Sequence, residues 1–484
     1  MACACARCGG ARGIVLKALF KSFFSRGAKR DGHAAGALAL AKDLQKKGEP
    51  HAAIAAYREA LDHGASAAPI HLQLGVLHAS LSEHEHAIDH LEKALKLAPD
   101  DADALCMLGT VMNDLRRFEE AVALFERALA LRPDFPEAHF NLGLARFERS
   151  DFEGAARSFA RCAVLNRGEP WSEARRAALS PHPSPPFPPE DMAVNEIKLR
   201  HDCEQLEYLL GLGRLPASYR EVLEDYRRLL EEVRGKVGID SVVPFDGARH
   251  PLVARTYKRP IYLANPPLPE GPLVNPELDF RAIEDGYLGA KPNIVTVDGL
   301  LAPGALRALR EYCLESTIWN NIKPGYLGAY FFDGFCSELL LRIALELRER
   351  LPGMMRGLPL QMMWGYKCES TLPGLGVHAD EAAVNVNFWI TEDDANLDVE
   401  RGGLLVYRQD APRDWGFAKF NKDSATILRY LESTGGAPVR VPYRANRAVI
   451  FDSDLFHATD RPVFRDGYLN RRINITFLYG RRSM

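Results

Sequence analysis

The stretch VHADEAAVNVNFWI, residues 377–390, decides the character of the C-terminal part of this chain. Its alternating, β-branched run has the period of two that predicts a strand. In an extended segment, residues i and i+2 point to the same face, so the side chains of His378 and Asp380 converge on one point. This spacing is consistent with half of a metal site and also with a surface His–Asp hydrogen bond on a turn.

A second histidine favours the metal site. VRVPYRANRAVIFDSDLFHATDRPV, residues 439–463, predicts two strands joined by a polar turn, with His457 just beyond the end of the second strand. Two imidazoles and one carboxylate on one face of an ion leave coordination positions open for other ligands. We therefore predict a metal site formed by His378, Asp380 and His457.

An arginine follows in the next predicted strand, RRINITFLYG, residues 471–480. Alternation places Arg472, Asn474 and Thr476 on one face of this strand and apolar residues on the other. A guanidinium group matches a carboxylate with two parallel hydrogen bonds, so an inward-facing Arg472 would bind an acid. A salt bridge at the rim of a barrel is the alternative interpretation.

The order and spacing of these motifs resemble those of the Fe(II)- and 2-oxoglutarate-dependent dioxygenases. GGLLVY (402–407) and the two strand regions above fall in the order of that family's double-stranded β-helix. PNIVTVDGLLAPGALRALREYC (292–313) is similar to the strand-then-helix entry of prolyl 4-hydroxylase-like members. NFWITEDDANLDVERGGLLVY (387–407) resembles phytanoyl-CoA-hydroxylase-type members. The resemblance runs from Pro292 to Met484.

The resemblance implies the roles of particular residues. Arg472 would bind the 5-carboxylate of 2-oxoglutarate beside Asn474, where many members have serine, and Tyr366 is a further candidate partner of that carboxylate. The interval from histidine to arginine is longer than is usual in the family, which leaves Arg471 as an alternative to Arg472. No catalytic residue is expected beyond the metal ligands. The implied ligands of Fe(II) are His378, Asp380 and His457.

The resemblance also implies a set of cofactors and a reaction. Fe(II) would be the metal, 2-oxoglutarate the cosubstrate and dioxygen the oxidant, with ascorbate as a candidate additional cofactor. The carboxylate among the metal ligands favours hydroxylation or a related oxidation over halogenation, because members that halogenate have a small residue at that position.

A different pattern occupies residues 34–167, where small, apolar and proline residues recur every 34 residues. It resembles tetratricopeptide repeats, each a pair of antiparallel helices, and a degenerate first unit brings the count to about four. Stacked repeats bury a surface that one repeat could not bury alone. The recurring residues are Gly75, Gly109 and Gly143; Ala87, Ala121 and Ala155; Leu91, Phe125 and Phe159; and Pro99 and Pro133.

A repeat array of this kind predicts a concave surface that holds an extended peptide. The inner helices would present Asn113 and Asp114 to this groove, although each residue is equally typical of a solvated or capping position. We therefore expect a protein or peptide partner.

Composition limits the remaining function classes. The chain has 484 residues, 47% of them hydrophobic, and a net charge of −3, which indicates neither nucleic acid nor a general electrostatic partner. No apolar run approaches the ~20 residues of a membrane span. Nine cysteines without framework spacing favour a reducing compartment, so we expect the cytoplasm. The basic, acid-free N-terminal segment leaves a targeting function open.

At this length a single core is not expected, and we predict a multidomain chain. Within the oxygenase domain, residues 408–440 are too long for a hairpin turn and suggest a lid, in which Trp415 and Phe417 would contact substrate or pack the insertion down. The expected parts are a basic, disordered extension (1–33), an all-α tetratricopeptide-repeat solenoid (34–167), a proline-rich linker (168–192), a helical and irregular wrap (193–290), and a double-stranded β-helix (jelly-roll) oxygenase domain with supporting helices (291–484).

The expected function is hydroxylation of a protein or peptide that the repeats recruit. Two alternatives remain open. One is an interaction scaffold whose oxygenase domain is degenerate or only senses iron and 2-oxoglutarate. The other is a hydroxylase of small molecules whose repeats recruit a partner or build a dimer.

Overall fold

The computed structural model describes residues 32–168, 193–235, 241–369, 374–435 and 437–482. The chain divides into two compact units, Met1–Leu165 and Asn166–Met484. Apart from a few residues at their edges, the predicted basic extension and the predicted proline-rich linker lie outside the described residues.

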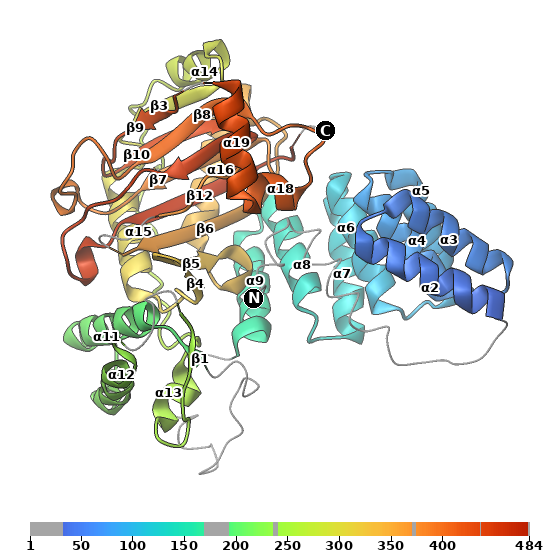
Figure 1. Cartoon of the computed structure of the whole chain (residues 1–484), viewed down its shortest axis with the longest axis horizontal. Helices are drawn as coiled ribbons and strands as arrows, with labels where there is room; N and C mark the ends of the chain where they lie inside the picture. The colour runs from blue at the N-terminus through green and yellow to red at the C-terminus, as the bar shows by residue number, and fades with distance from the viewer. Residues whose placement is uncertain (1–31, 169–192, 236–240, 370–373, 436, 483–484) are drawn as a thin grey trace. The chain divides into compact units, whose positions relative to one another are not determined.

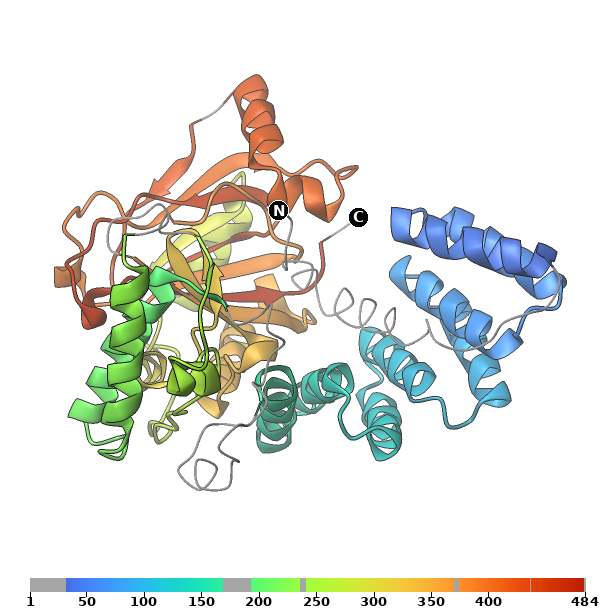
Figure 2. The same cartoon turned by 60° about the horizontal axis from the view of Figure 1, so that its bottom comes forward.

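Eight consecutive helices form the described part of the first unit, and Figure 2 shows them following one another in chain order from blue to teal. Successive helices pack as antiparallel pairs, with α2 against α3, α4 against α5, and α6 against α7. The interval of 34 residues therefore corresponds to one helix pair. The helices are α2 (Gly32–Lys47), α3 (Pro50–Asp62), α4 (Ala67–Ser80), α5 (His84–Leu97), α6 (Ala102–Asp114), α7 (Phe118–Leu131), α8 (Pro136–Glu148) and α9 (Phe152–Arg167).

The recurring glycines explain how the helices of each pair approach so closely. A Cβ atom on Gly109 would lie 2.8 Å from the Phe125 ring, and one on Gly143 would lie 2.6 Å from the Phe159 ring. Both rings are fully buried, with 0% exposure. In each of these pairs, the glycine of the first helix therefore makes room for a large apolar side chain of the second helix. This contact is why the two residue types recur together in the sequence.

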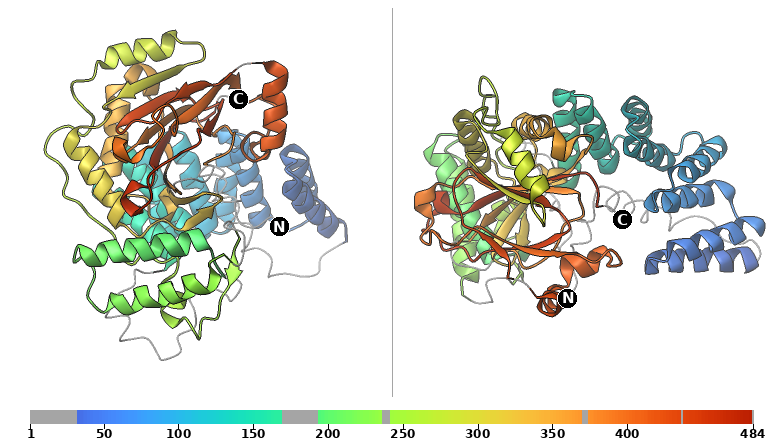
Figure 3. Two further views of the ribbon diagram at one scale, coloured as in Figure 1. Left: turned by 60° about the vertical axis from the view of Figure 1, so that its left-hand side comes forward. Right: turned by 90° about the horizontal axis from the view of Figure 1, so that it is seen from above.

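The second unit begins with a helical region. Figure 3 (left) shows α11 (Glu196–Gly211) and α12 (Tyr219–Val233) side by side, as their apolar periodicity predicts. The Asn195 side chain caps α11 by accepting a hydrogen bond from the Lys198 amide at 3.2 Å. The predicted irregular region contains further short elements: β1 (Ala193–Val194), β2 (Val243–Pro244), α13 (Pro251–Thr256) and α14 (Phe280–Gly289).

Two antiparallel sheets form the rest of this unit (Figure 1). The larger sheet has the strand order β3-β10-β7-β12-β6-β5-β4, and the smaller has the order β11-β8-β9. The strands are β3 (Ile294–Asp298), β4 (Asn321–Lys323), β5 (Tyr326–Tyr330), β6 (Leu360–Cys368), β7 (Val384–Trp389), β8 (Leu404–Asp410), β9 (Val439–Val441), β10 (Arg447–Asp452), β11 (Leu455–Thr459) and β12 (Ile473–Tyr479).

Helices connect the strands or follow them. They are α15 (Pro303–Glu315), α16 (Glu338–Arg350), α17 (Pro352–Met355), α18 (Phe417–Lys422), α19 (Ser424–Thr434) and the 3-10 turns η2 (Phe331–Asp333), η3 (Asp393–Ala395) and η4 (Tyr468–Asn470).

The core of this unit lies between the two sheets. One cluster of buried side chains joins Trp389 of β7 and Phe451 of β10 to Leu404 of β8 and Leu455 of β11. The opposite face of the larger sheet is also covered, because the Tyr479 hydroxyl of β12 donates to the carbonyl of Ala344 in α16 at 2.7 Å. Every residue of β12 is consequently buried. The result is a helical repeat unit followed by a β-rich unit.

We predict that Gly143→Ala destabilises the repeat unit. The added methyl group would overlap the buried Phe159 ring, and overpacking of this kind costs about 1–3 kcal/mol. Chemical denaturation of the full chain, followed by helical circular dichroism, measures the effect.

Gly36→Ala is the matched control, because no atom lies within 4 Å of the Cβ position at this helical glycine. The control should raise stability by about 0.5–1 kcal/mol. Equal effects of the two substitutions would show that the close approach at Gly143 is unimportant.

Candidate metal centre

The geometry of the site begins with a pair of backbone hydrogen bonds between two distant segments. The amide of His378 donates to the carbonyl of His457 at 3.0 Å, and the amide of His457 donates to the carbonyl of His378 at 2.8 Å. His457 lies within β11, and His378 lies in the extended segment that precedes β7. The reciprocal pair holds the two imidazole centroids 4.3 Å apart.

Asp380 completes the cluster. Its amide donates to the Ser453 carbonyl at 3.1 Å, which fixes the segment after His378. The carboxylate lies 3.6 Å from Nε2 of His378 and 3.4 Å from Nε2 of His457. The Asn385 side chain donates to Oδ2 of Asp380 at 2.9 Å and orients the carboxylate.

The two histidines present matching nitrogen atoms to the aspartate. Nδ1 of His378 lies 2.9 Å from the Gly376 carbonyl, and Nδ1 of His457 lies 3.0 Å from the Leu455 carbonyl. A carbonyl only accepts, so each Nδ1 donates. Nε2 of each ring, the atom that faces the carboxylate, is therefore the candidate ligand atom.

Electrostatics favour neutral His378 and ionised Asp380 near neutral pH, which are the states that bind a metal. Burial, together with the neighbouring His457, lowers the pKa of His378 to about 4. Burial raises the pKa of Asp380, but the two imidazoles and the Asn385 amide outweigh it and leave that pKa below its ordinary value. His378 is consequently neutral and Asp380 ionised at pH 7.

The donor set fits a divalent transition metal. One ligand atom from each of His378, Asp380 and His457 lies within 4.8 Å of the others, and all three side chains are buried. Two neutral imidazoles and one carboxylate suit Fe(II) and similar borderline ions. A buried carboxylate also needs a positive partner, and a metal ion would supply it.

Arg472 lines the same pocket. Its side chain is almost fully buried, and it donates through Nε to the Gly402 carbonyl at 2.6 Å and through Nη2 to the Gly403 carbonyl at 3.2 Å. Among the described residues, none forms a salt bridge with it. A buried guanidinium without an acid is costly, so an anionic ligand would stabilise it.

Arg471 lies in a different environment. It forms ion pairs with Glu369, which is buried, and with Glu204 of α11, 2.9 Å from its Nη2 atom. Arg200 also binds Glu369, at 2.9 Å. The structure therefore places Arg472 in the pocket and Arg471 in an ion-pair network, as alternation along the strand requires.

A polar row crosses the pocket beside Arg472. The side chains of Asn387 and Asn474 both donate to Oγ1 of Thr476, at 3.1 and 3.2 Å. Tyr366 lies opposite Asn474 on β6 and also lines the pocket. The structure thus brings Asn474 and Tyr366 together with the three metal-ligand candidates and Arg472.

Sequence reasoning missed several pocket residues. Within the described part of the chain, Oδ1 of Asn387 and Nε1 of Trp364 are buried and have no hydrogen-bond partner, and both residues line the pocket. The alternation VNVN in residues 384–387 was a usable signal, because an amide in an otherwise apolar strand needs a buried partner. The other asparagine of this pattern, Asn385, orients Asp380.

The insertion over residues 408–440 contacts the backbone of the metal-ligand segment. The Ala379 amide donates to the Phe420 carbonyl at 3.0 Å, and the Asn421 side chain donates to the Ala379 carbonyl at 2.8 Å. Trp415 and Phe417 are not among the pocket-lining residues and pack beside Phe420 in a cluster of their own. Their packing role is observed, and a substrate contact remains a prediction.

The groove candidates lie in the other unit, at the C-terminal end of α6. The Asn113 side chain donates to the Asn141 carbonyl of α8 at 3.1 Å and so joins neighbouring repeats. Its Oδ1 atom has no hydrogen-bond partner among the described residues. Asp114 is partly buried at the same helix end.

Comparison with known families identifies the helical unit. Tetratricopeptide-repeat models match residues 66–134 and 106–170. A search among curated proteins found no match to this sequence.

Solved structures with similar segments include three repeat proteins. A MamA structure from Desulfovibrio magneticus RS-1 is 22% identical and covers 29% of this chain and 80% of its own, with a TM-score of 0.28. YrrB, described as a TPR protein with an unusual peptide-binding site, is 25% identical over 32% of this chain and 74% of its own, with a TM-score of 0.25. TTC0263, a thermophilic TPR protein of Thermus thermophilus, is 17% identical over 27% of this chain and 74% of its own, with a TM-score of 0.26.

The N-terminal part of the chain is thus a tetratricopeptide-repeat solenoid, a scaffold for protein interactions. Among the described residues, no helix combines the length and the apolar character that crossing a bilayer requires.

Proposed function

We propose that the β-rich unit is an Fe(II)- and 2-oxoglutarate-dependent dioxygenase with a double-stranded β-helix fold. The observation that carries the proposal is one pocket that contains both a facial set of two histidines and one aspartate and a buried arginine without an acidic partner among the described residues. The two antiparallel sheets that enclose this pocket support the proposed fold. Bound iron would supply oxidative decarboxylation of 2-oxoglutarate and oxidation of the prime substrate.

The residues of the chain perform binding and orientation in this proposal. His378, Asp380 and His457 would hold the metal, and three protein ligands would leave coordination positions open for the cosubstrate. Arg472 binds the distal carboxylate of 2-oxoglutarate, and Asn474 and Tyr366 lie beside it. The surrounding buried side chains exclude water, which strengthens each of these charged contacts.

The repeats suggest the class of substrate. A solenoid on the same chain raises the local concentration of a bound protein or peptide at the pocket without altering the chemistry there. We therefore propose a protein or peptide hydroxylase, with the prime substrate recruited by the repeats and ascorbate as a candidate additional cofactor.

A scaffold with a degenerate or sensing oxygenase domain is the second candidate. The family matches favour it, because they reach only the repeats. The complete donor set and the orienting hydrogen bonds at both histidines favour an active enzyme. Turnover of 2-oxoglutarate distinguishes the two functions directly.

We predict that the purified protein binds Fe(II) at His378, Asp380 and His457 and slowly converts 2-oxoglutarate to succinate without a prime substrate. His378→Ala and Asp380→Ala each remove one of three ligands, so metal binding and turnover should fall together. Anaerobic metal titration and succinate release measure the two quantities.

His139→Ala, on α8, is the control and should retain both properties. Full succinate production by His378→Ala would refute the assigned site. Metal binding without any turnover in the unaltered protein would favour the sensing scaffold.

We also predict that Arg472→Lys raises the concentration of 2-oxoglutarate required for turnover. Lysine keeps the charge but loses the paired donors, and disrupting a buried charge-assisted pair costs about 2–5 kcal/mol, or at least roughly 30-fold in affinity. Iron binding should change little. The measurement is the dependence of succinate release on 2-oxoglutarate.

Arg471→Lys provides the comparison, since Arg471 is committed to Glu204 and Glu369. This variant should lose stability but keep the affinity for 2-oxoglutarate. The opposite result for the two arginines would assign the carboxylate contact to Arg471.

The repeats generate a further prediction about the substrate. Asn113→Ala combined with Asp114→Ala should weaken capture of the protein partner and its iron-dependent gain of one oxygen atom, as detected by mass spectrometry. Uncoupled 2-oxoglutarate turnover should persist, because these residues lie in the repeat unit.

Asp134→Ala, an exposed acidic position in the same unit, is the control. If the oxidised product is a free metabolite formed at an equal rate by all variants, the enzyme acts on small molecules. An unchanged partner yield would place the docking surface elsewhere on the solenoid.

A further inference from the structure

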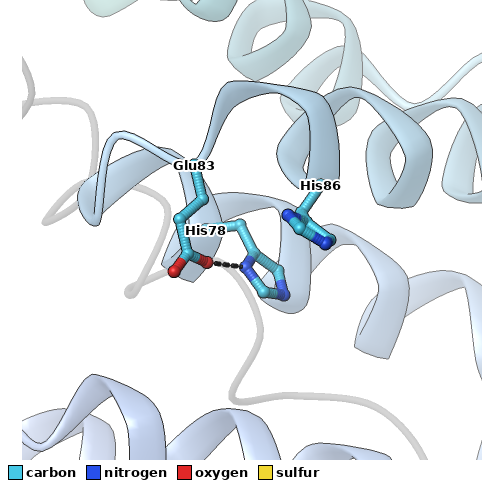
Figure 4. Close-up of side chains that lie close together, drawn as sticks. All are labelled: His78, Glu83 and His86. Atoms are coloured by element: carbon cyan, nitrogen blue, oxygen red, sulfur yellow. Dashed lines mark hydrogen bonds and ion pairs between the residues drawn. The ribbon is translucent and has the colours of Figure 1, made fainter.

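A second cluster of metal-ligand side chains lies in the repeat unit, at the corner between α4 and α5 (Figure 4). One ligand atom from each of His78, Glu83 and His86 lies within 4.8 Å of the others. His78 is buried, whereas the side chains of Glu83 and His86 are accessible to solvent. The cluster is therefore open on one side.

The turn between the helices brings these residues together. His78 lies near the end of α4, Glu83 immediately precedes α5, and His86 lies in the first turn of α5. The Glu83 amide donates to the His78 carbonyl at 2.9 Å, and Ser82 adopts a left-handed φ of 61° that reverses the chain. The backbone thus positions the three side chains, and the two exposed ones keep their rotational freedom.

One ring nitrogen of His78 has no hydrogen-bond partner among the described residues. Its Nδ1 atom lies 2.5 Å from Oε2 of Glu83, and an ionised carboxylate only accepts, so Nδ1 donates. Nε2 is buried and is the atom without a partner. His78 as a whole is only 4% exposed, so this nitrogen is an unsatisfied buried polar atom.

Further imidazoles surround this nitrogen-rich corner. The rings of His78 and His86 stack with centroids 5.2 Å apart, and those of His78 and His90 stack with centroids 5.4 Å apart. His90 in turn lies beside His71, with Nδ1 atoms 3.0 Å apart. The corner therefore gathers four imidazoles, which offer nitrogen donors of the kind that transition metals prefer.

The repeat fold does not require these residue types. At the equivalent corner of the next repeat, Arg117 and Glu120 form an ion pair at 2.6 Å. In the repeat after that, Arg146 lies 3.8 Å from Asp151. Other repeats therefore place charged residues without histidine at this corner, so the repeat fold does not account for the histidines of the α4–α5 corner.

We propose that His78, Glu83 and His86 bind one zinc-type divalent ion, which joins α4 to α5. Two imidazoles and one carboxylate suit Zn²⁺ and similar borderline ions, and they do not suit Mg²⁺ or Ca²⁺. A tetrahedral site needs donors about 3.3 Å apart, and the accessible Glu83 and His86 side chains would rotate to reach this spacing. This site is independent of the metal centre in the β-rich unit.

Isothermal titration with ZnCl₂ tests the proposal on the untagged full chain. Titrations use two backgrounds, the unaltered protein and a His378→Ala, His457→Ala variant that removes two ligands of the other centre. In each background, His86→Gln combined with Glu83→Gln should remove one equivalent of bound zinc or weaken its binding at least tenfold. Both altered residues are accessible, so circular dichroism should remain unchanged.

His139→Gln combined with Glu85→Gln is the matched control, because it makes the same chemical changes in the same unit outside the cluster. It should leave the zinc stoichiometry unchanged. Unaltered zinc binding by the His86→Gln, Glu83→Gln protein in both backgrounds would overturn the proposal, as would the absence of zinc binding in the His378→Ala, His457→Ala background. The two proposals fail with different signatures. If the β-rich unit binds no metal, both backgrounds bind the same number of ions, and if it binds metal without being an oxygenase, the zinc counts stay as expected and only 2-oxoglutarate turnover is missing.

Cobalt provides a second measurement. In the His378→Ala, His457→Ala background, Co²⁺ bound at the α4–α5 corner should show a visible absorption band that depends on His86. The same band after His86→Gln is added to this background would also overturn the proposal.

Discussion

The candidate metal centre depends on the reciprocal backbone hydrogen bonds between His378 and His457. These two bonds join segments that are distant in sequence and place both imidazoles on one side of the same short bridge. The Ser453 carbonyl then fixes Asp380, and the Phe420 carbonyl fixes Ala379. Because the backbone holds the three ligand candidates, their side chains are preorganised for a metal ion.

Burial of charge organises the rest of the pocket. Arg471 and Arg472 are adjacent in sequence but point to opposite sides of the chain. Arg471 is neutralised by Glu204 and Glu369. Arg472 has only carbonyl and sulfur acceptors among the described residues. A ligand of opposite charge would stabilise a buried guanidinium of this kind, so the position of Arg472 is where we propose that an anion binds.

The repeat unit shows how one scaffold accepts different local chemistry. Its structural requirement is met by glycines that admit large apolar side chains, as at Gly109 with Phe125. The corners between paired helices are less constrained, because they lie at the surface. One corner has an arginine–glutamate pair, at Arg117 and Glu120, and another has the cluster of His78, Glu83 and His86. Positions outside the interlocked core are therefore available for binding functions.

The sequence by itself determined the helical repeats and the alternating strands, because periodicity is a local property that survives without knowledge of neighbours. It also identified the grouping of His378, Asp380, His457 and Arg472, although their roles remain proposals. Alternation already favoured Arg472 over Arg471, and only the tertiary structure showed that Arg471 pairs with Glu204 of a helix far away in sequence. It likewise decided that Trp364 and Asn387 line the same pocket as Arg472. Non-local contacts bring these side chains together, whereas a local pattern only assigns each one to a face of its strand.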